Sequence, residues 1–367
     1  MNNNKSTTRQ QTQTAIDPFR LVAAFLIVAI HTAPLSTFSE TADFLFSYCF
    51  ARIAVPFFLM TTGYFVLSPL ISKKSGSMNP RPLVSPYKRF WKSMKKTALL
   101  YLGATALYLP VNIYSGKLPG LNDIFKVLVF DGTFYHLWYL PATLLGMLLL
   151  FLLFKKYSSR ILMPVCVTLY LIGLLGDSWY GLVSKLPPVK SFYDVLFSIS
   201  SYTRNGFFYA PVFLLMGAVV SHRRIRRRFD TVMINLTGTL FFLLLMLGEG
   251  FLSFHLEWQR HNSMYLFLIP CMYFLFRLLL CLPGKGKPML RQATLWIYIL
   301  HPLVIILIRG FAKLTRLTPY LVENSLIHYL AVCAASFILA LAVTAFSPVL
   351  AALATTIWKQ KLPRKRR

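Results

Sequence analysis

The chain has 367 residues, of which 56% are hydrophobic and only 14% are charged, and its mean hydropathy is +0.58. A soluble domain of this size rarely carries so few charges, and apolar runs of about twenty residues, the length of a helix that crosses a lipid bilayer, recur along the sequence. In a soluble protein the net charge of +28 would suggest a nucleic-acid partner, but membrane proteins gather Lys and Arg at their cytoplasmic face. The composition predicts an all-α, polytopic membrane protein with the lipid bilayer, and no nucleic acid, as its partner.

The apolar segments, taken in chain order, give the predicted architecture. Residues 1–15, rich in Asn, Gln and Thr, predict a disordered cytosolic tail, residues 16–358 a transmembrane domain and residues 359–367 a basic cytosolic tail. The first span itself would serve as an uncleaved insertion signal. Ten helical spans are expected, at residues 18–37, 51–71, 97–115, 137–154, 161–176, 206–221, 232–248, 263–282, 292–310 and 326–350.

The charges of the loops test this arrangement. With the amino terminus in the cytosol, the inner segments hold 27 lysines and arginines against two acids, whereas the outer segments hold ten against nine. Cytoplasmic loops carry an excess of Lys and Arg, and one miscounted helix would mix the two sets. The segregation therefore predicts ten spans with both termini cytoplasmic.

Soluble-enzyme motifs are missing from the sequence. It contains no P-loop, no GxGxxG motif and no internal repeat, so an inverted-repeat transporter gains no support. The site is therefore expected among polar side chains within helices, with no metal and no bound cofactor. The cysteines lie in apolar segments without CxxC pairing and are interpreted as small buried hydrophobic residues; they are Cys49, Cys166, Cys271, Cys281 and Cys333.

Two polar residues interrupt the first span. In "DPFRLVAAFLIVAIHTAP", ten apolar residues separate Arg20 from His31. Eleven steps of about 100° make roughly three turns, so both side chains lie on one helix face, roughly 16 Å apart. Ionisable residues inside a span usually face a cavity or a partner. His31 could act as a general base near the outer side, or it could hydrogen-bond a neighbouring helix. Asp17, followed by Pro18, is expected to cap this helix.

Five segments, in order, resemble the membrane-bound acyltransferase-3 family of bacterial ten-helix acyltransferases. They are "PFFLMTTGYF", "SPYKRFWKSMKK", "YHLWYLPATLLG", "RNGFFYAPVFLLMG" and "LWIYILHPLVI". The family's hallmark is an Arg–x10–His pair in the first span, which Arg20 and His31 match. Its usual Ser-Gly-Phe motif after the aromatic pair of the second span is Thr62-Gly63-Tyr64 in this sequence, a conservative departure.

The resemblance implies transfer of an acyl group, in the simplest case acetyl from acetyl-CoA, from cytosolic acyl-CoA to a hydroxyl or amine of a small-molecule or glycan acceptor. Arg20, Lys88, Arg89 and Lys92 would contact the donor phosphates, and His31 would deprotonate the acceptor or form a transient acyl intermediate. Paired arginines are common in this inner loop of the family; "KRFWK" keeps the charge but only half of the bidentate geometry. The loop cations also fit simple positive-inside anchoring.

Secondary candidates lie near the ends of later spans. His136 could bind the acceptor or belong to an interfacial aromatic belt. Arg204 could hold a substrate carboxylate, and Glu249 could orient an imidazole or a substrate amine, or lie in solvent. His301 precedes Pro302 and could donate to the carbonyls that the proline leaves free.

Within the family, the sequence is most similar to the membrane portion of the vancomycin-resistance serine racemases, on the run "IDPFRLVAAFLIVAIHTAPLSTFSETADFLF" and the following "ARIAVPFFLMTTGYF". Those proteins continue into a soluble racemase domain that uses pyridoxal phosphate, which this sequence does not contain. It would then be a stand-alone relative, or the membrane part of a longer protein, in a bacterial plasma membrane with a fused or partner racemase. A second hypothesis is therefore a transporter that supplies L-serine, with Arg204 and Glu249 as an amino-acid clamp.

Overall fold

The computed structural model describes residues 15–74, 85–221, 231–284, 286 and 288–361. Every element in this part of the chain is a helix, as the composition predicts. Of the expected tails, residues 1–14 and 362–367 lie outside the described residues, whereas residues 359–361 are helical; residues 75–84 of the inner loop and the arginine-rich segment 222–230 also lie outside them.

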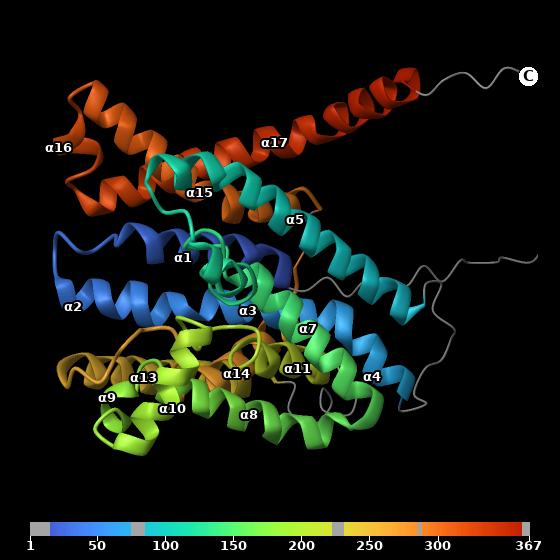
Figure 1. Cartoon of the computed structure of the whole chain (residues 1–367), viewed down its shortest axis with the longest axis vertical. Helices are drawn as coiled ribbons and strands as arrows, with labels where there is room; N and C mark the ends of the chain where they lie inside the picture. The colour runs from blue at the N-terminus through green and yellow to red at the C-terminus, as the bar shows by residue number, and fades with distance from the viewer. Residues whose placement is uncertain (1–14, 75–84, 222–230, 285, 287, 362–367) are drawn as a thin grey trace, which may run out of the picture.

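The main helices form one bundle, with α2 and α16 at the left end of Figure 1 and α4 and the carboxyl end of α17 at the right. Each of the ten predicted spans overlaps a helix or a run of consecutive helical segments. The second span is such a run, from α2 to α4. The bounds are α1 (Ile16–Thr32), α2 (Glu40–Asp43), η1 (Phe44–Cys49), η2 (Phe50–Ile53), α3 (Ala54–Thr62), η3 (Gly63–Leu67), α4 (Ser68–Lys74), α5 (Pro86–Tyr114), α7 (Tyr139–Lys156), α8 (Ser159–Leu175), α11 (Ala210–Val220), α13 (Val232–His255), α14 (Leu268–Cys281), α15 (Pro288–Leu314) and α17 (Ser325–Lys361).

Six of these helical stretches are long and apolar enough to cross a membrane. They begin at residues 40, 86, 139, 232, 288 and 325, whereas α8, α11 and α14 are apolar but shorter and α1 has 17 residues. The chain is therefore a multi-pass membrane protein. Short helices lie in the connections: η4 (Leu121–Asp123), α6 (Ile124–Lys126), η5 (Val127–Asp131), α9 (Tyr180–Val183), α10 (Pro187–Ile199) and α16 (Thr318–Leu321).

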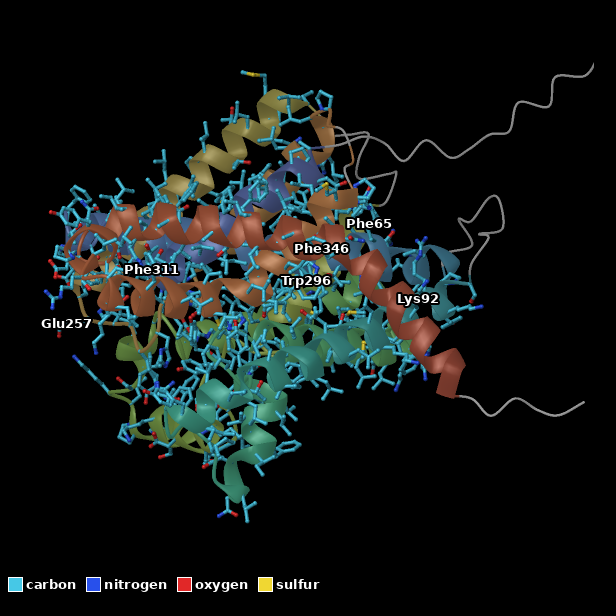
Figure 2. The ribbon with its side chains drawn as sticks, turned by 90° about the horizontal axis from the view of Figure 1, so that it is seen from above. Phe65, Lys92, Glu257, Trp296, Phe311 and Phe346 are labelled. Atoms are coloured by element: carbon cyan, nitrogen blue, oxygen red, sulfur yellow. The ribbon has the colours of Figure 1, made fainter. Side chains whose placement is uncertain are left out.

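The first helix lies inside the bundle rather than on its surface. It packs against α3, α15 and α17, while α11 packs against α3, α7 and α8. By contrast, α5 and α13 are mostly exposed and carry large apolar side chains such as Leu102 and Leu244. Such an apolar outer surface suits lipid contact. Lys92 and Glu257 lie at opposite ends of the bundle in Figure 2.

Two glycines bring the second span into close contact with α11. A Cβ atom at Gly63 would overlap the backbone carbonyl of Leu214, and one at Gly217 would overlap that of Met60. Membrane helices approach closely where small residues meet, because dispersion contacts between backbones replace the missing hydrophobic drive. The glycine of the Thr62-Gly63-Tyr64 motif is therefore required for helix packing.

Proline positions explain two local features of the helices. Pro56 lies near the start of α3, directly after the 3₁₀ segment η2, where the helical hydrogen-bond pattern is already irregular. Pro302 lies inside α15, where the ring leaves the carbonyl of Tyr298 without its usual helical donor. His301 supplies a replacement: its Nδ1 lies 3.0 Å from the carbonyl oxygens of both Ile297 and Tyr298. The predicted interaction of His301 with these carbonyls is confirmed.

Candidate functional site

A cavity of about 580 Å³ lies among α1, the second span, α5, α7 and α15. Apolar, aromatic and small polar side chains make up most of its wall. Among the described residues that line it, no side chain is acidic, and the cations are Arg20, Arg52, Lys96, Arg204 and Arg291. A cavity whose charged lining residues are all cations is suited to anionic ligands.

Both polar residues of the first span line this cavity, so the predicted common face of Arg20 and His31 is confirmed. Their chemical roles remain predictions. His31 lies in the last turn of α1, which ends where Ala33 adopts a left-handed backbone conformation (φ 49°) and Pro34 follows. The side chain of His31 is only partly buried, and so its ring can meet a molecule in the cavity.

Two other histidines surround His31. Its ring stacks on that of His301, with 5.3 Å between the centroids, and His136 lies 5.3 Å from His301 in an edge-to-face arrangement. Because both contacts of the His301 Nδ1 are carbonyl oxygens, Nδ1 carries the proton and Nε2 is left as an acceptor. That Nε2 is buried and has no hydrogen-bond partner among the described residues.

His136 also belongs to this cluster. It is 2% exposed and lines the cavity, and its backbone carbonyl accepts a hydrogen bond from the Tyr298 hydroxyl at 2.9 Å. Neither ring nitrogen has a hydrogen-bond partner within the described part of the chain. This position is inside the bundle, not in an aromatic belt facing the headgroups. Its part in acceptor binding stays a prediction.

The end of the cavity that contains Arg20 and Arg291 is named the inner end after the predicted topology, and Asp17 joins these two arginines there. One carboxylate oxygen of Asp17 lies 3.1 Å from Nε of Arg20, and the other lies 3.2 Å from Nε of Arg291. The predicted capping role of Asp17 is wrong, since its side chain makes no cap hydrogen bond. It neutralises part of the cationic lining instead, while Lys96 adds another cation at this end.

Of the four cations predicted to contact the donor, Arg20 lines the cavity and the three on α5 do not. Lys88, Arg89 and Lys92 are exposed on the first turns of α5 and do not line the cavity. The residues of α5 that do are Ser93, Lys96, Thr97 and Leu100. Their spacing of three, four and seven residues is that of one helix face.

Arg204 is held at the outer end by the "RNGFF" loop. The Asn205 side chain accepts from the backbone N–H groups of Phe207 and Phe208 and donates to Ser200 and Tyr202. An Asn side chain stabilises a turn in this way because it makes hydrogen bonds with nearby backbone groups. Arg204 lines the cavity, as expected for a residue that meets substrate.

Glu249 is not brought to the cavity. Its carboxylate accepts hydrogen bonds from the Trp179 indole at 2.9 Å and from the backbone N–H groups of Leu266 and Phe267 at 2.8 and 3.1 Å. All three donors belong to segments that lead into α9 or α14. The carboxylate therefore joins three segments of the fold, and it neither lies in solvent nor pairs with Arg204.

Sequence reasoning missed three cations of the cavity wall: Arg52, Lys96 and Arg291. Arg52 directly precedes the "IAVPFFLM" segment of the second span, and this position was the only sequence signal for it. Within the described residues, no group of three or more His, Cys, Asp or Glu side chains is placed to hold a metal ion.

The fold and the cavity define a multi-pass helical membrane protein with an internal, cation-lined site that contains a histidine cluster. Comparison with known families adds the assignment: the acyltransferase-3 model, described as an acyltransferase domain, matches residues 13–345. The chain belongs to this family.

Curated relatives are similar over most of the chain. An amino-acid racemase of Enterococcus faecalis is 41% identical over 345 residues, which are 92% of this chain and 46% of the relative. A serine/alanine racemase of Enterococcus gallinarum is 37% identical over 325 residues, 86% of this chain and 44% of the relative. The chain thus spans about half the length of the curated relatives it matches. No solved structure matches it.

Proposed function

We propose that this protein transfers an acyl group, in the simplest case acetyl, from cytosolic acyl-CoA to a hydroxyl or amine of a small-molecule or glycan acceptor at the envelope side of a bacterial plasma membrane. The observation that carries the proposal is the cavity that holds both Arg20 and His31. Membership of an acyltransferase family supports it.

The proposal includes ten spans with both termini in the cytosol. Two observations support it: each predicted span overlaps a helix, and Lys92 and Glu257, assigned to opposite sides, lie at opposite ends of the bundle in Figure 2. The shorter helices α8, α11 and α14 would span with the help of adjoining residues and a locally thinner bilayer.

The donor would enter at the inner end, where Arg20, Lys96 and Arg291 meet. Charge-assisted hydrogen bonds from these cations would hold its phosphates. The exposed Lys88, Arg89 and Lys92 would attract the donor without lying against it. The thioester, at the end of a flexible arm, would then reach along the α1 face toward His31.

His31 is the proposed general base. It takes the proton from the acceptor O–H or N–H as that oxygen or nitrogen forms a bond to the thioester carbonyl carbon. The C–S bond then breaks, and the imidazolium returns the proton to the departing thiolate. The His301 ring, fixed by its carbonyl contacts, keeps the orientation of His31 through the stacked contact. His136 is a proposed acceptor contact, and Arg204 a proposed carboxylate contact.

A second function is favoured by the names of the relatives, which are racemases. In that case the chain would be the membrane portion of a serine racemase in vancomycin resistance, and would supply L-serine to a fused or partner racemase. The same cavity would then serve as a transport path, and His31 would not need to act as a base.

A paired assay on the purified protein in liposomes separates the two. Acetyl-CoA turnover that falls at least about 100-fold in His31→Gln supports acyl transfer, because a positioned base contributes roughly 10² to 10⁴ in rate. His255→Gln is the matched control, since His255 is exposed at the end of α13, away from the cavity. Counterflow of radiolabelled L-serine with no acetyl-CoA turnover would refute the acyltransferase proposal.

A further inference from the structure

Two arginines line the outer end of the cavity, and neither touches an acid of the described residues. Arg52 lies on η2 of the second span, is 7% exposed, and its guanidinium carbon lies 5.3 Å from the centre of the Tyr48 ring. Its buried Nε has no hydrogen-bond partner among the described residues. A buried Nε without a partner, on a guanidinium that no acid touches among the described residues, is costly.

Arg204 is enclosed in a similar way. Its guanidinium carbon lies 4.3 Å from the centre of the Tyr202 ring and 5.2 Å from that of Trp138, and one terminal nitrogen donates to the Ser263 hydroxyl at 2.9 Å. Its Nε is also buried without a partner in the described part of the chain. The aromatic walls hold the guanidinium plane, so its orientation is set before any ligand arrives.

Asp177 is the acid that acts on Arg204, but it does not contact the two arginines. Asp177 acts on Arg204 electrostatically, but one of its carboxylate oxygens accepts from the backbone N–H groups of Ser263 and Met264 at 2.7 and 3.0 Å. It does not line the cavity. Arg52 is buried and Arg204 is partly buried, and the one acid that acts on Arg204 is Asp177, so the pair keeps a surplus of one positive charge, which matches a monoanion.

We propose that Arg52 and Arg204 together bind the carboxylate of a small α-amino or α-hydroxy acid. A guanidinium presents two parallel N–H donors that fit the two oxygens of a planar carboxylate. A ligand held here would present its amine or hydroxyl to the same cavity as His31, whose ring is exposed to the charges of both arginines. This last step rests on the proposed acyl transfer, whereas carboxylate binding does not.

Direct binding without an acyl donor tests the site. The purified full chain in detergent is titrated with radiolabelled L-serine, and L-serinamide and inorganic phosphate are added as competitors. L-serine is expected to bind, and L-serinamide, which lacks the carboxylate charge, to compete at least about 10-fold more weakly. Arg52→Gln and Arg204→Gln are each expected to weaken binding at least about 10-fold.

Arg260→Gln is the matched control. Arg260 lies in the same outer region, donates to the Ser201 carbonyl at 2.8 Å and stacks on Phe197, but does not line the cavity. Binding in this variant should stay within about twofold of wild type. If the glutamine variants do not fold, Arg52→Lys and Arg204→Lys keep the charge but lose the fork, and should weaken binding about fivefold or more.

Four results would overturn the proposal. They are no serine binding by the folded protein, equal competition by L-serinamide, displacement by phosphate at lower concentration than by serine, and unchanged binding in the arginine variants. Serine binding that needs both arginines, in a protein that does not turn over acetyl-CoA, would refute acyl transfer and leave this site standing. Acetyl-CoA turnover without serine binding would refute this carboxylate site and leave the proposed acyl transfer standing.

Discussion

The two ends of the cavity carry similar charges in different surroundings. At the inner end, Asp17 joins Arg20 and Arg291, and the side chain of Arg291 is 39% exposed. At the outer end, Arg52 lies against one aromatic ring and Arg204 against two, and neither touches an acid within the described part of the chain. Arg291 at the first end is partly exposed and paired with an acid, whereas Arg52 at the second end is buried and touches no acid among the described residues.

This difference separates two recognition tasks. An open mouth with a built-in anion can exchange a large, multiply charged ligand, because Asp17 takes the place of the phosphates when they leave. An enclosed pair of guanidinium groups selects by shape and charge, because an ill-fitting ligand leaves buried donors unpaired. The inner end thus suits an acyl-CoA donor, and the outer end a small carboxylate acceptor.

The largest expected effect is a change in KM when an arginine at one end or the other is replaced. Arg20→Gln should raise the KM for acetyl-CoA about 10- to 100-fold and leave the acceptor KM nearly unchanged, since a charged hydrogen bond contributes about 1.5–3 kcal/mol. Arg204→Gln should raise the acceptor KM by a similar factor and spare the donor. Steady-state kinetics in liposomes, with each substrate varied in turn, measures both. If each variant changes both constants equally, the ends do not act separately.

A smaller effect on stability should distinguish Glu249 from the cavity cations. Glu249→Gln removes the negative charge of the carboxylate that accepts hydrogen bonds from the Trp179 indole and from two backbone N–H groups. The free energy of unfolding should fall by about 1–3 kcal/mol. Thermal unfolding in detergent measures this loss, and the turnover per folded molecule should remain that of wild type. A large loss of turnover at full stability would place Glu249 in the site.

The sequence predicted the parts of this comparison that depend on local periodicity. Helical spacing placed Arg20 and His31 on one face, and Pro302 identified the carbonyl contacts of His301. Arg52 could not be found in this way, because its burial depends on the π and 3₁₀ segments η1 and η2 and on the packing of distant helices. Asp17 was misjudged because its partner Arg291 is far away in the sequence.

The cations of α5 show the same limit. The predicted third span began at residue 97, but α5 begins at Pro86, so residues taken for a loop belong to a helix. Only the face that includes Ser93 and Lys96 lines the cavity. Composition shows that positive charges gather in this segment. Which of these side chains line the cavity depends on the rotation of α5 against its neighbours.

That rotation gives the next prediction. Both lysines are exposed, but only Lys96 lines the cavity, so Lys96→Gln should raise the KM for acetyl-CoA about fivefold, whereas Lys92→Gln, one turn away, should change it less than about twofold. The same kinetic assay compares the two variants, which remove equal charge from the same helix. Equal effects would mean that acetyl-CoA binding depends on the total charge of the inner surface and not on the side chains of the cavity wall.

The smallest effect should come from salt. Exposed charges are screened over about 8–10 Å at physiological ionic strength, whereas enclosed pairs are screened much less. Raising the salt concentration from about 50 to 300 mM should therefore weaken acetyl-CoA binding about two- to threefold and leave carboxylate binding at Arg52 and Arg204 nearly unchanged. Parallel titrations of wild type with each ligand measure the two slopes. An equal salt dependence would show that the outer end is as open to water as the inner end, and the contrast between the two arginine sets would then lie in their partners alone.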